Sequence, residues 1–229
     1  TDDGNMYGGF TVTVNDIVAN GQRTYLTNAV LDAMLVELRE ALIHEPGATY
    51  VLTTSQSAAF TAVHHEHVPE DVAVRMTKEI FELLPQPHVQ RFLMLLNLDN
   101  VHWIGVEVSV RGGKVIVFDS SDGTCANEKV FVVQRAVLFA SQYARWLRRE
   151  DPTCDVTLTW EPSYVNAPAQ RDGDNCGAFS FAHLCCAGGG LDLRDISVVG
   201  DHLRLGMLFT LIQRGYMYEA VRAQWRASR

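Results

Sequence analysis

The sequence has no long apolar run and little basic charge. None of its hydrophobic stretches approaches the roughly 20 consecutive residues that a membrane-spanning helix needs. Only three of its 19 basic residues are lysine, and 27 acidic residues bring the net charge to −8. Nucleic-acid-binding proteins need a basic face, and the polar, acidic start at residues 1–5 lacks the pattern of a signal peptide. We therefore expect neither membrane insertion nor nucleic-acid binding.

The sequence also lacks the cysteine spacing of a disulfide framework or a zinc ribbon. Its cysteines are odd in number, none belongs to a CxxC motif, and they occupy positions 125, 154, 176, 185 and 186. Such a set suits a reducing compartment. We expect the cytoplasm or the nucleus, which would be those of a host cell if the protein is a delivered effector.

One cluster, His-His-Glu-His at residues 64–67, has side chains that could bind a metal. Adjacent residues rarely converge on one ion, because a tetrahedral site draws its ligands from separated segments. We expect an exposed loop here, and neither a metal nor another cofactor.

The apolar content is sufficient for one sizeable core. The chain has 229 residues, 47% of them hydrophobic, with no internal repeat or linker. We expect a flexible tail over residues 1–11 and a single catalytic domain over residues 12–229. Hydrophobic periodicity predicts helices over 24–43, 70–84, 127–149 and 201–226, and strands over 92–98, 103–110, 115–118 and 155–160. Residues 10–18 are expected to form a short strand or an extended entry.

The most informative segment is residues 170–179, a loop rich in Gly and Asp that turns into a helix. Asp174 and Asn175 are good N-cap residues, so Cys176 should lie in the first helical turn. The positive end of a helix favours a thiolate, and its free N–H groups can bind an oxyanion. Gln170 could bring an amide donor to the same point. A lone cysteine in such a place is most often a packing residue, so the interpretation depends on its partners.

Those partners are His102 and Asp119. His102 directly precedes the strand predicted at 103–110 and Asp119 follows the next strand, with sixteen residues between them that close a hairpin at 111–114. In an antiparallel hairpin the start of one strand lies beside the end of its partner. We therefore expect the carboxylate to orient the imidazole, and Cys176 to complete a catalytic set.

The order His, Asp, Gln, Cys resembles the ubiquitin-like-protein-specific peptidases, the ULP/SENP group of clan CE. The matching segments are His102-Trp103, Phe118-Asp119-Ser120, Gln170 and Cys176-Gly177-Ala178-Phe179. Residues 25–32 resemble the opening helix of that family. Arg204 and Met207, which precede Leu211-Ile212, fit its C-terminal helix. The resemblance runs from about residue 12 to about residue 218.

This resemblance implies an α+β fold of the ULP/adenain type, in which helices flank a central mixed sheet and the nucleophile begins a helix. It implies a monomer that cleaves after the C-terminal Gly-Gly of a ubiquitin-like modifier, SUMO or ubiquitin, whose conjugates are its partners. In these roles Cys176 is the nucleophile, His102 is the base, Asp119 orients His102, and Gln170 binds the oxyanion.

The resemblance also implies substrate-binding residues. Trp103 would cover a narrow channel that admits only a Gly-Gly tail, since glycine has no side chain to clash; the alternative is a plain core residue. Tyr25 and Asn28 would help to clamp the tail, although they replace the usual Trp and Asp. A further departure is Asn175, which stands where the family usually has Asp. These departures leave open which modifier is cleaved.

Two other functions fit parts of the pattern. YopJ-type acetyltransferases resemble the chain in the same residue order, and would use Cys176 to carry an acetyl group from acetyl-CoA. Their activator-binding surface is basic, unlike the acidic balance here. The non-enzyme alternative is a module that binds ubiquitin-like proteins through a degenerate site, although all four catalytic residues are present.

Overall fold

The computed structural model describes residues 26–42, 49–57, 81–82, 84, 89–98, 101–121, 126–165, 168–191 and 200–213. The tail at 1–11, the short strand or extended entry expected at 10–18, the histidine cluster at 64–67 and most of the helix expected at 70–84 lie outside these residues. None of the helices in the described part of the chain is long and apolar enough to cross a membrane.

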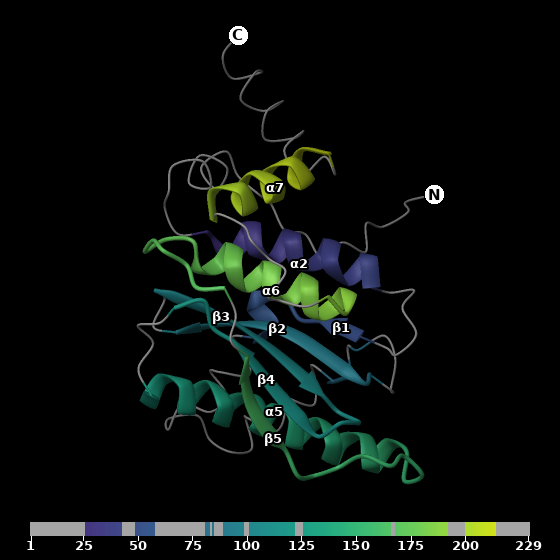
Figure 1. The fold of residues 1–229 in the computed structure, drawn as a ribbon. Helices are drawn as coiled ribbons and strands as arrows, with labels where there is room; N and C mark the ends of the chain where they lie inside the picture. Colours follow the sequence, from purple (N-terminus) through teal and green to yellow (C-terminus); the bar gives the residue numbers. More distant parts are fainter. Residues whose placement is uncertain are drawn as a thin grey trace, which may run out of the picture.

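A five-stranded mixed sheet forms the centre, in the order β1-β2-β3-β4-β5 (Figure 1). The antiparallel middle consists of β2 (Arg91–Leu98), β3 (His102–Ser109) and β4 (Lys114–Phe118). Edge strand β1 (Thr49–Val51) runs parallel to β2, and edge strand β5 (Glu161–Val165) runs parallel to β4. The hairpin predicted between β3 and β4 is thereby confirmed.

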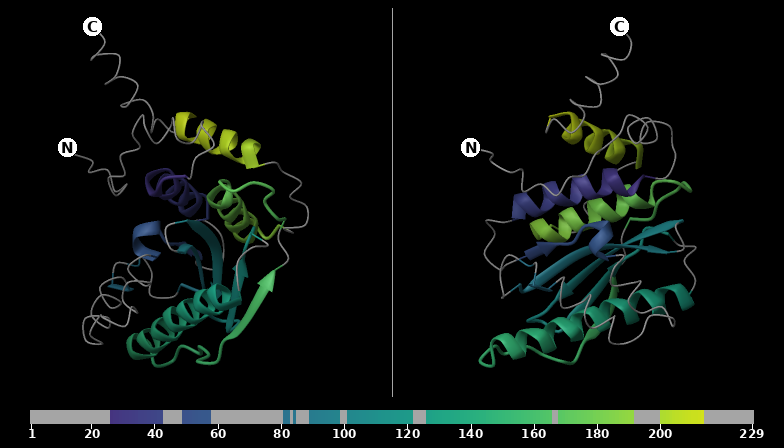
Figure 2. Two further views of the ribbon diagram at one scale, coloured as in Figure 1. Left: turned by 90° about the vertical axis from the view of Figure 1, so that its left-hand side faces the viewer. Right: turned by 180° about the vertical axis from the view of Figure 1, so that it is seen from behind.

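Helices cover both faces of the sheet. α5 (Ala126–Glu150) lies on one face, while α2 (Asn28–Leu42) and α6 (Cys176–Gly189) lie on the other. α7 (Gly200–Gln213) forms an outer layer over α6 and α2 (Figures 1 and 2). The α+β fold with a mixed sheet flanked by helices is the one expected.

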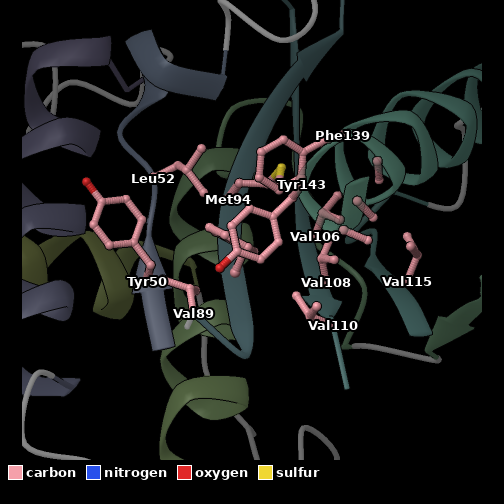
Figure 3. Packing of buried hydrophobic residues seen from close by; sticks show 14 of the residues in the cluster. Tyr50, Leu52, Val89, Met94, Val106, Val108, Val110, Val115, Phe139 and Tyr143 are labelled. Carbon is pink, nitrogen blue, oxygen red and sulfur yellow. The ribbon is translucent and has the colours of Figure 1, made fainter. Parts of the chain in front are cut away.

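The strands divide their apolar side chains between two cores because successive residues point to opposite faces. On β2, Phe92 and Met94 belong to the core under α5, whereas Leu93 and Leu95 belong to the core under α2 and α6. Figure 3 shows the α5 core, where Phe139 and Tyr143 lie over the sheet residues Met94, Val106 and Val108. Buried on both faces, β2 reads as the continuous apolar run seen in the sequence.

The strand predicted at 155–160 is wrong. These residues form no strand, and the edge strand follows at 161–165. Thr157 Oγ1 donates to the Thr159 carbonyl at 3.1 Å and accepts from the Thr159 N–H at 3.0 Å, so this segment uses local hydrogen bonds in place of a ladder. The strand at 161–165 was missed because it contains Pro162, a residue that normally argues against a strand. Proline is tolerated here because β5 is an edge strand. Strand β1 was also not predicted.

Candidate active site

His102 and Asp119 lie together at one end of the β3–β4 hairpin. His102 is the first residue of β3 and Asp119 directly follows β4, whose last residue, Phe118, pairs with Gly105. The distance from His102 Nε2 to Asp119 Oδ1 is 2.9 Å. Their side chains are 16% and 7% exposed, so water screens the contact little. The hairpin therefore brings these two residues together as the sequence predicted.

Opposing influences set the protonation of His102. Burial lowers the pKa of the imidazole, but hydrogen bonds to Asp119 and Cys176, together with the negative charge of both groups, raise it to about 9. The hydrogen bond to Asp119 uses Nε2, which leaves Nδ1 as the ring nitrogen for Cys176. An imidazolium at neutral pH is the partner that a thiolate requires.

Cys176 is the first residue of α6, and only 1% of it is exposed. Close packing of α6 on β3 carries it to the His102 end of the sheet. A Cβ on Gly105 would lie 3.2 Å from the carbonyl oxygen of Ser180, closer than most such contacts, so glycine favours this approach. The Ser180 hydroxyl then donates to the Trp103 carbonyl at 2.8 Å. The thiol thus reaches the imidazole through contacts between residues far apart in the sequence.

The N-cap expected of Asp174 and Asn175 needs a correction. Asn175 occupies the N-cap position, but its side chain makes no capping hydrogen bond. The amide instead accepts from Arg204 Nε and donates to Asp172 Oδ2 at 2.9 Å. Hydrogen bonds to Arg204 and Asp172 thus replace the expected capping bond. The helix ends at Gly190, which adopts a left-handed conformation with φ 65°.

Gln170 is held by two neighbours. Its Oε1 accepts from the Ser120 hydroxyl at 2.8 Å, and its Nε2 donates to the Asp172 carbonyl at 2.8 Å. The Gln170 N–H also donates to the Ser120 carbonyl at 2.8 Å. Because Ser120 follows Asp119, these bonds tie the loop that carries Gln170 to the end of β4 beside the His102–Asp119 pair.

Trp103 is buried against the start of α6. A Cβ on Gly177 would lie 3.3 Å from Trp103 Cδ1 and 3.4 Å from Leu26 Cδ1, so the three residues meet beside Cys176. Asn28, the first residue of α2, is exposed two positions after Leu26. Tyr25 lies outside the described residues.

Two residues of this region were not predicted to have a place here. Asp172 accepts from the backbone N–H of Asn175 at 3.0 Å, and Arg204 on α7 donates to the Asp174 carbonyl at 2.5 Å. Arg204 was noted only as a residue of the C-terminal helix. No local pattern links Arg204 to a loop 30 residues earlier, and for Asp172 only the Gly- and Asp-rich composition of the loop indicated internal hydrogen bonding.

Comparison with known proteins gives a family. Residues 53–188 match the model described as the Ulp1 protease family, C-terminal catalytic domain. A comparison with curated protein sequences gives no match.

Several solved structures share the fold. The C-terminal Ulp1 protease domain in complex with Smt3, the yeast ortholog of SUMO, superposes with a TM-score of 0.70 at 10% identity, over 91% of this chain and 86% of that chain. The SUMO protease Ulp1 with its catalytic cysteine oxidised to a sulfenic acid gives 0.71 at 12% identity, over 91% and 87%. The Xanthomonas campestris effector XopD bound to ubiquitin gives 0.56 at 18% identity, over 82% and 91%.

These likenesses establish the Ulp1-like fold, and the family match extends over the strands that carry His102 and Asp119 and over most of α6. The resemblance found in the sequence is thereby confirmed. The chain belongs to the Ulp1 protease family and is a cysteine protease.

Proposed function

We propose that this protease cleaves after the C-terminal Gly-Gly of a ubiquitin-like modifier, SUMO or ubiquitin, to release it from conjugates or to process its precursor. The observation that carries the proposal is the contact between His102 Nε2 and Asp119 Oδ1 at 2.9 Å, beside a cysteine at a helix N-terminus whose interaction with the same imidazole helps to raise the pKa of His102.

The proposed reaction is acyl transfer through the thiolate of Cys176. The sulfur attacks the carbonyl carbon of the terminal glycine, and the N–H groups of Gln170 and of the helix start bind the oxyanion. The C–N bond then breaks and His102 protonates the leaving amine, which leaves a thioester. His102 next takes a proton from water, the hydroxide attacks the thioester, and the thiolate returns. Asp119 holds the imidazole in the required tautomer.

Support for the modifier comes from two of the similar structures and from Trp103. One similar domain is in complex with Smt3, the yeast ortholog of SUMO, and another protein, XopD, is bound to ubiquitin. Trp103 and Gly177 lie together beside Cys176, and an indole there would line a channel too narrow for side chains. We further propose that Asn28, with Tyr25, contacts the tail of the modifier. We also propose a host cell as the setting in which this protein acts, since one similar structure is that of an effector protein.

A panel of activity probes tests this function. SUMO and ubiquitin with a reactive electrophile at the C-terminus should label the wild type, and Cys176→Ala should abolish both labelling and hydrolysis of the corresponding C-terminal amides. Cys154→Ala is the matched control, since this free thiol lies after α5 and should leave both signals unchanged. Turnover that persists in Cys176→Ala would remove Cys176 as the nucleophile.

The acetyltransferase alternative is separated by a second measurement. Incubation with acetyl-CoA followed by mass spectrometry would detect an acetyl-thioester on Cys176 if the thiol carried acetyl groups. We expect no such adduct. Labelling by neither probe together with an acetyl-thioester would favour the alternative.

A further inference from the structure

Arg204 is a buried cation that the proposed reaction does not use. It lies on α7, in the outer helix layer, with only 4% of its surface exposed. A buried charge is costly unless hydrogen bonds and opposite charges compensate for it. Burial lowers the pKa of Arg204, while the carboxylates of Asp174, Asp172 and Asp201 raise it. The first two of these carboxylates lie in the loop that precedes Cys176.

The guanidinium donates to that loop through two of its nitrogens. Nε donates to the Asn175 side-chain oxygen, and Nη2 donates to the Asp174 carbonyl at 2.5 Å. Packing at the start of α7 brings the two elements together, since a Cβ on Gly200 would lie 2.5 Å from Asn175 Nδ2. A planar fork of donors is suited to two acceptors at once, which a lysine ammonium matches poorly.

The Asn175 side chain links Arg204 to Asp172, another residue of the loop. Its oxygen faces a group that can only donate, and its amide nitrogen faces the Asp172 carboxylate, which can only accept when ionised. Asp172 also accepts from the backbone N–H groups of Asn175 and Asp174, at 3.0 and 3.3 Å. The amide orientation is therefore determined by chemistry on both sides.

The same network ends at Gln170. The carbonyl of Asp172 accepts from Gln170 Nε2 at 2.8 Å, and Ser120 holds the other end of that amide. Described hydrogen bonds thus run without a break from α7, through Asn175 and Asp172, to the side chain assigned to the oxyanion.

We propose that Arg204 is a positioning residue, which holds the loop 170–175 so that the Gln170 amide stays directed at the oxyanion. The proposal rests on the oxyanion role of Gln170 stated above. Arg204 acts through the loop and does not touch the substrate, so its loss should lower kcat with little change in KM.

Arg204→Lys tests the proposal, because it keeps the charge and removes the fork. Hydrolysis of the SUMO and ubiquitin C-terminal coumarin amides should fall in kcat by on the order of 10- to 100-fold. The rate at which iodoacetamide alkylates Cys176 should stay the same, because that reaction forms no oxyanion. Leu205→Ala, its exposed neighbour on α7, is the control and should leave both rates unchanged. An equal loss of alkylation would overturn the proposal.

A double-mutant cycle tells the two proposals apart. In a Gln170→Ala background, Arg204→Lys should have almost no further effect on kcat, because both substitutions remove the same contribution, the stabilisation of the oxyanion by Gln170. If the two losses multiply, Arg204 acts elsewhere and the inference is wrong, although the role of Gln170 stands. If Gln170→Ala alone has no effect, the oxyanion assignment fails.

Should Arg204→Lys not fold, Asp172→Asn interrupts the same network on the exposed loop and must give the same pattern of kinetic effects.

Discussion

His102 owes its protonation state to two neighbours that outweigh its burial. Burial by itself lowers the pKa of the imidazole, and the hydrogen bonds and charges of Asp119 and Cys176 oppose it. With both neighbours in place, its pKa is about 9. The group is therefore a cation across the neutral range, as the proposed reaction requires.

We expect the pH dependence of kcat/KM to reflect this pKa. For the wild type, activity should decline on the alkaline side near pH 9, as the imidazolium loses its proton. Asp119→Asn removes the negative charge and the acceptor, so it should move that decline to lower pH. It should also lower kcat/KM at pH 7 by on the order of 10²- to 10⁴-fold.

The comparison for this prediction is Asp155→Asn, an exposed position away from the pair, which should leave the profile unchanged. A pH profile of Asp119→Asn that coincides with the wild type would mean that Asp119 does not set the pKa of His102.

Asn175 departs from the Asp that the family pattern predicts, and Asp172 supplies a physical reason. A carboxylate at position 175 would face the Asp172 carboxylate where the Asn175 amide now donates at 2.9 Å. Two like charges at that distance would repel each other. Although burial raises the pKa of Asp172, hydrogen bonds from Asn175 and Asp174 hold it below its ordinary value. The amide is thus matched to an ionised neighbour.

Among the elements, the contact of α6 with β3 determines whether the thiol reaches the imidazole. The backbone of α6 approaches β3 at Gly105, and a Cβ there would lie 3.2 Å from a carbonyl oxygen of α6 and 3.4 Å from a Leu184 methyl group. Because this oxygen belongs to a helix backbone, it cannot yield as easily as the end of a flexible side chain could.

Gly105→Ala should therefore displace α6 from the sheet. We expect a loss of about 1–3 kcal/mol in the free energy of unfolding, as for other overpacked cores, and a fall in kcat/KM larger than this loss explains. Chemical denaturation and steady-state kinetics would measure the two effects.

Gly206→Ala on α7 is the control for Gly105→Ala. A Cβ at position 206 meets nothing within 4 Å, and alanine favours a helix more than glycine does. The substitution should stabilise the protein by roughly 0.5–1 kcal/mol and leave activity intact. If Gly105→Ala also left stability and activity unchanged, the close approach of α6 to β3 at Gly105 would not be needed for either.

For the whole molecule, the buried imidazole of His183 should shape the dependence of stability on pH. It is 0% exposed, and neither ring nitrogen has a hydrogen-bond partner among the described residues. It lies near the rings of Phe118 and Phe179, with centroid distances of 6.2 and 6.3 Å. Burial lowers its pKa to about 4, opposed by the charge of Asp119.

The folded state thus binds fewer protons at His183 than the unfolded chain does between about pH 6.5 and pH 4. Protons favour the state that binds more of them, so this residue should lower stability as pH falls through that window, by on the order of 3 kcal/mol in total. His183→Leu, which cannot titrate, should lose this part of the pH dependence in urea unfolding.

Because carboxylates such as Asp32 and Glu107 also have shifted pKa values, the informative quantity is the difference between wild type and variant at each pH. The exposed His202→Leu on α7 is the matched control and should follow the wild type. Parallel curves for the wild type and His183→Leu would show that His183 protonates normally in the fold.

Much of this organisation could be predicted from local patterns. Alternating and helical periodicity placed β2, β3, β4, α2 and α5 within a few residues of their observed bounds, because each is a continuous segment whose apolar face must be buried. The pairing of His102 with Asp119 also followed, since a hairpin has only one way to bring its ends together.

The sequence by itself thus determined the family, the hairpin pair and the helix that begins at Cys176. Tertiary structure alone decided that β5 begins after residue 160, that the Asn175 side chain serves Arg204 and not the helix end, and that His183 lies among aromatic rings. Periodicity and capping rules describe a segment's own backbone and its apolar face. A polar side chain takes its best available partner, and that partner is available only when a distant element packs beside it.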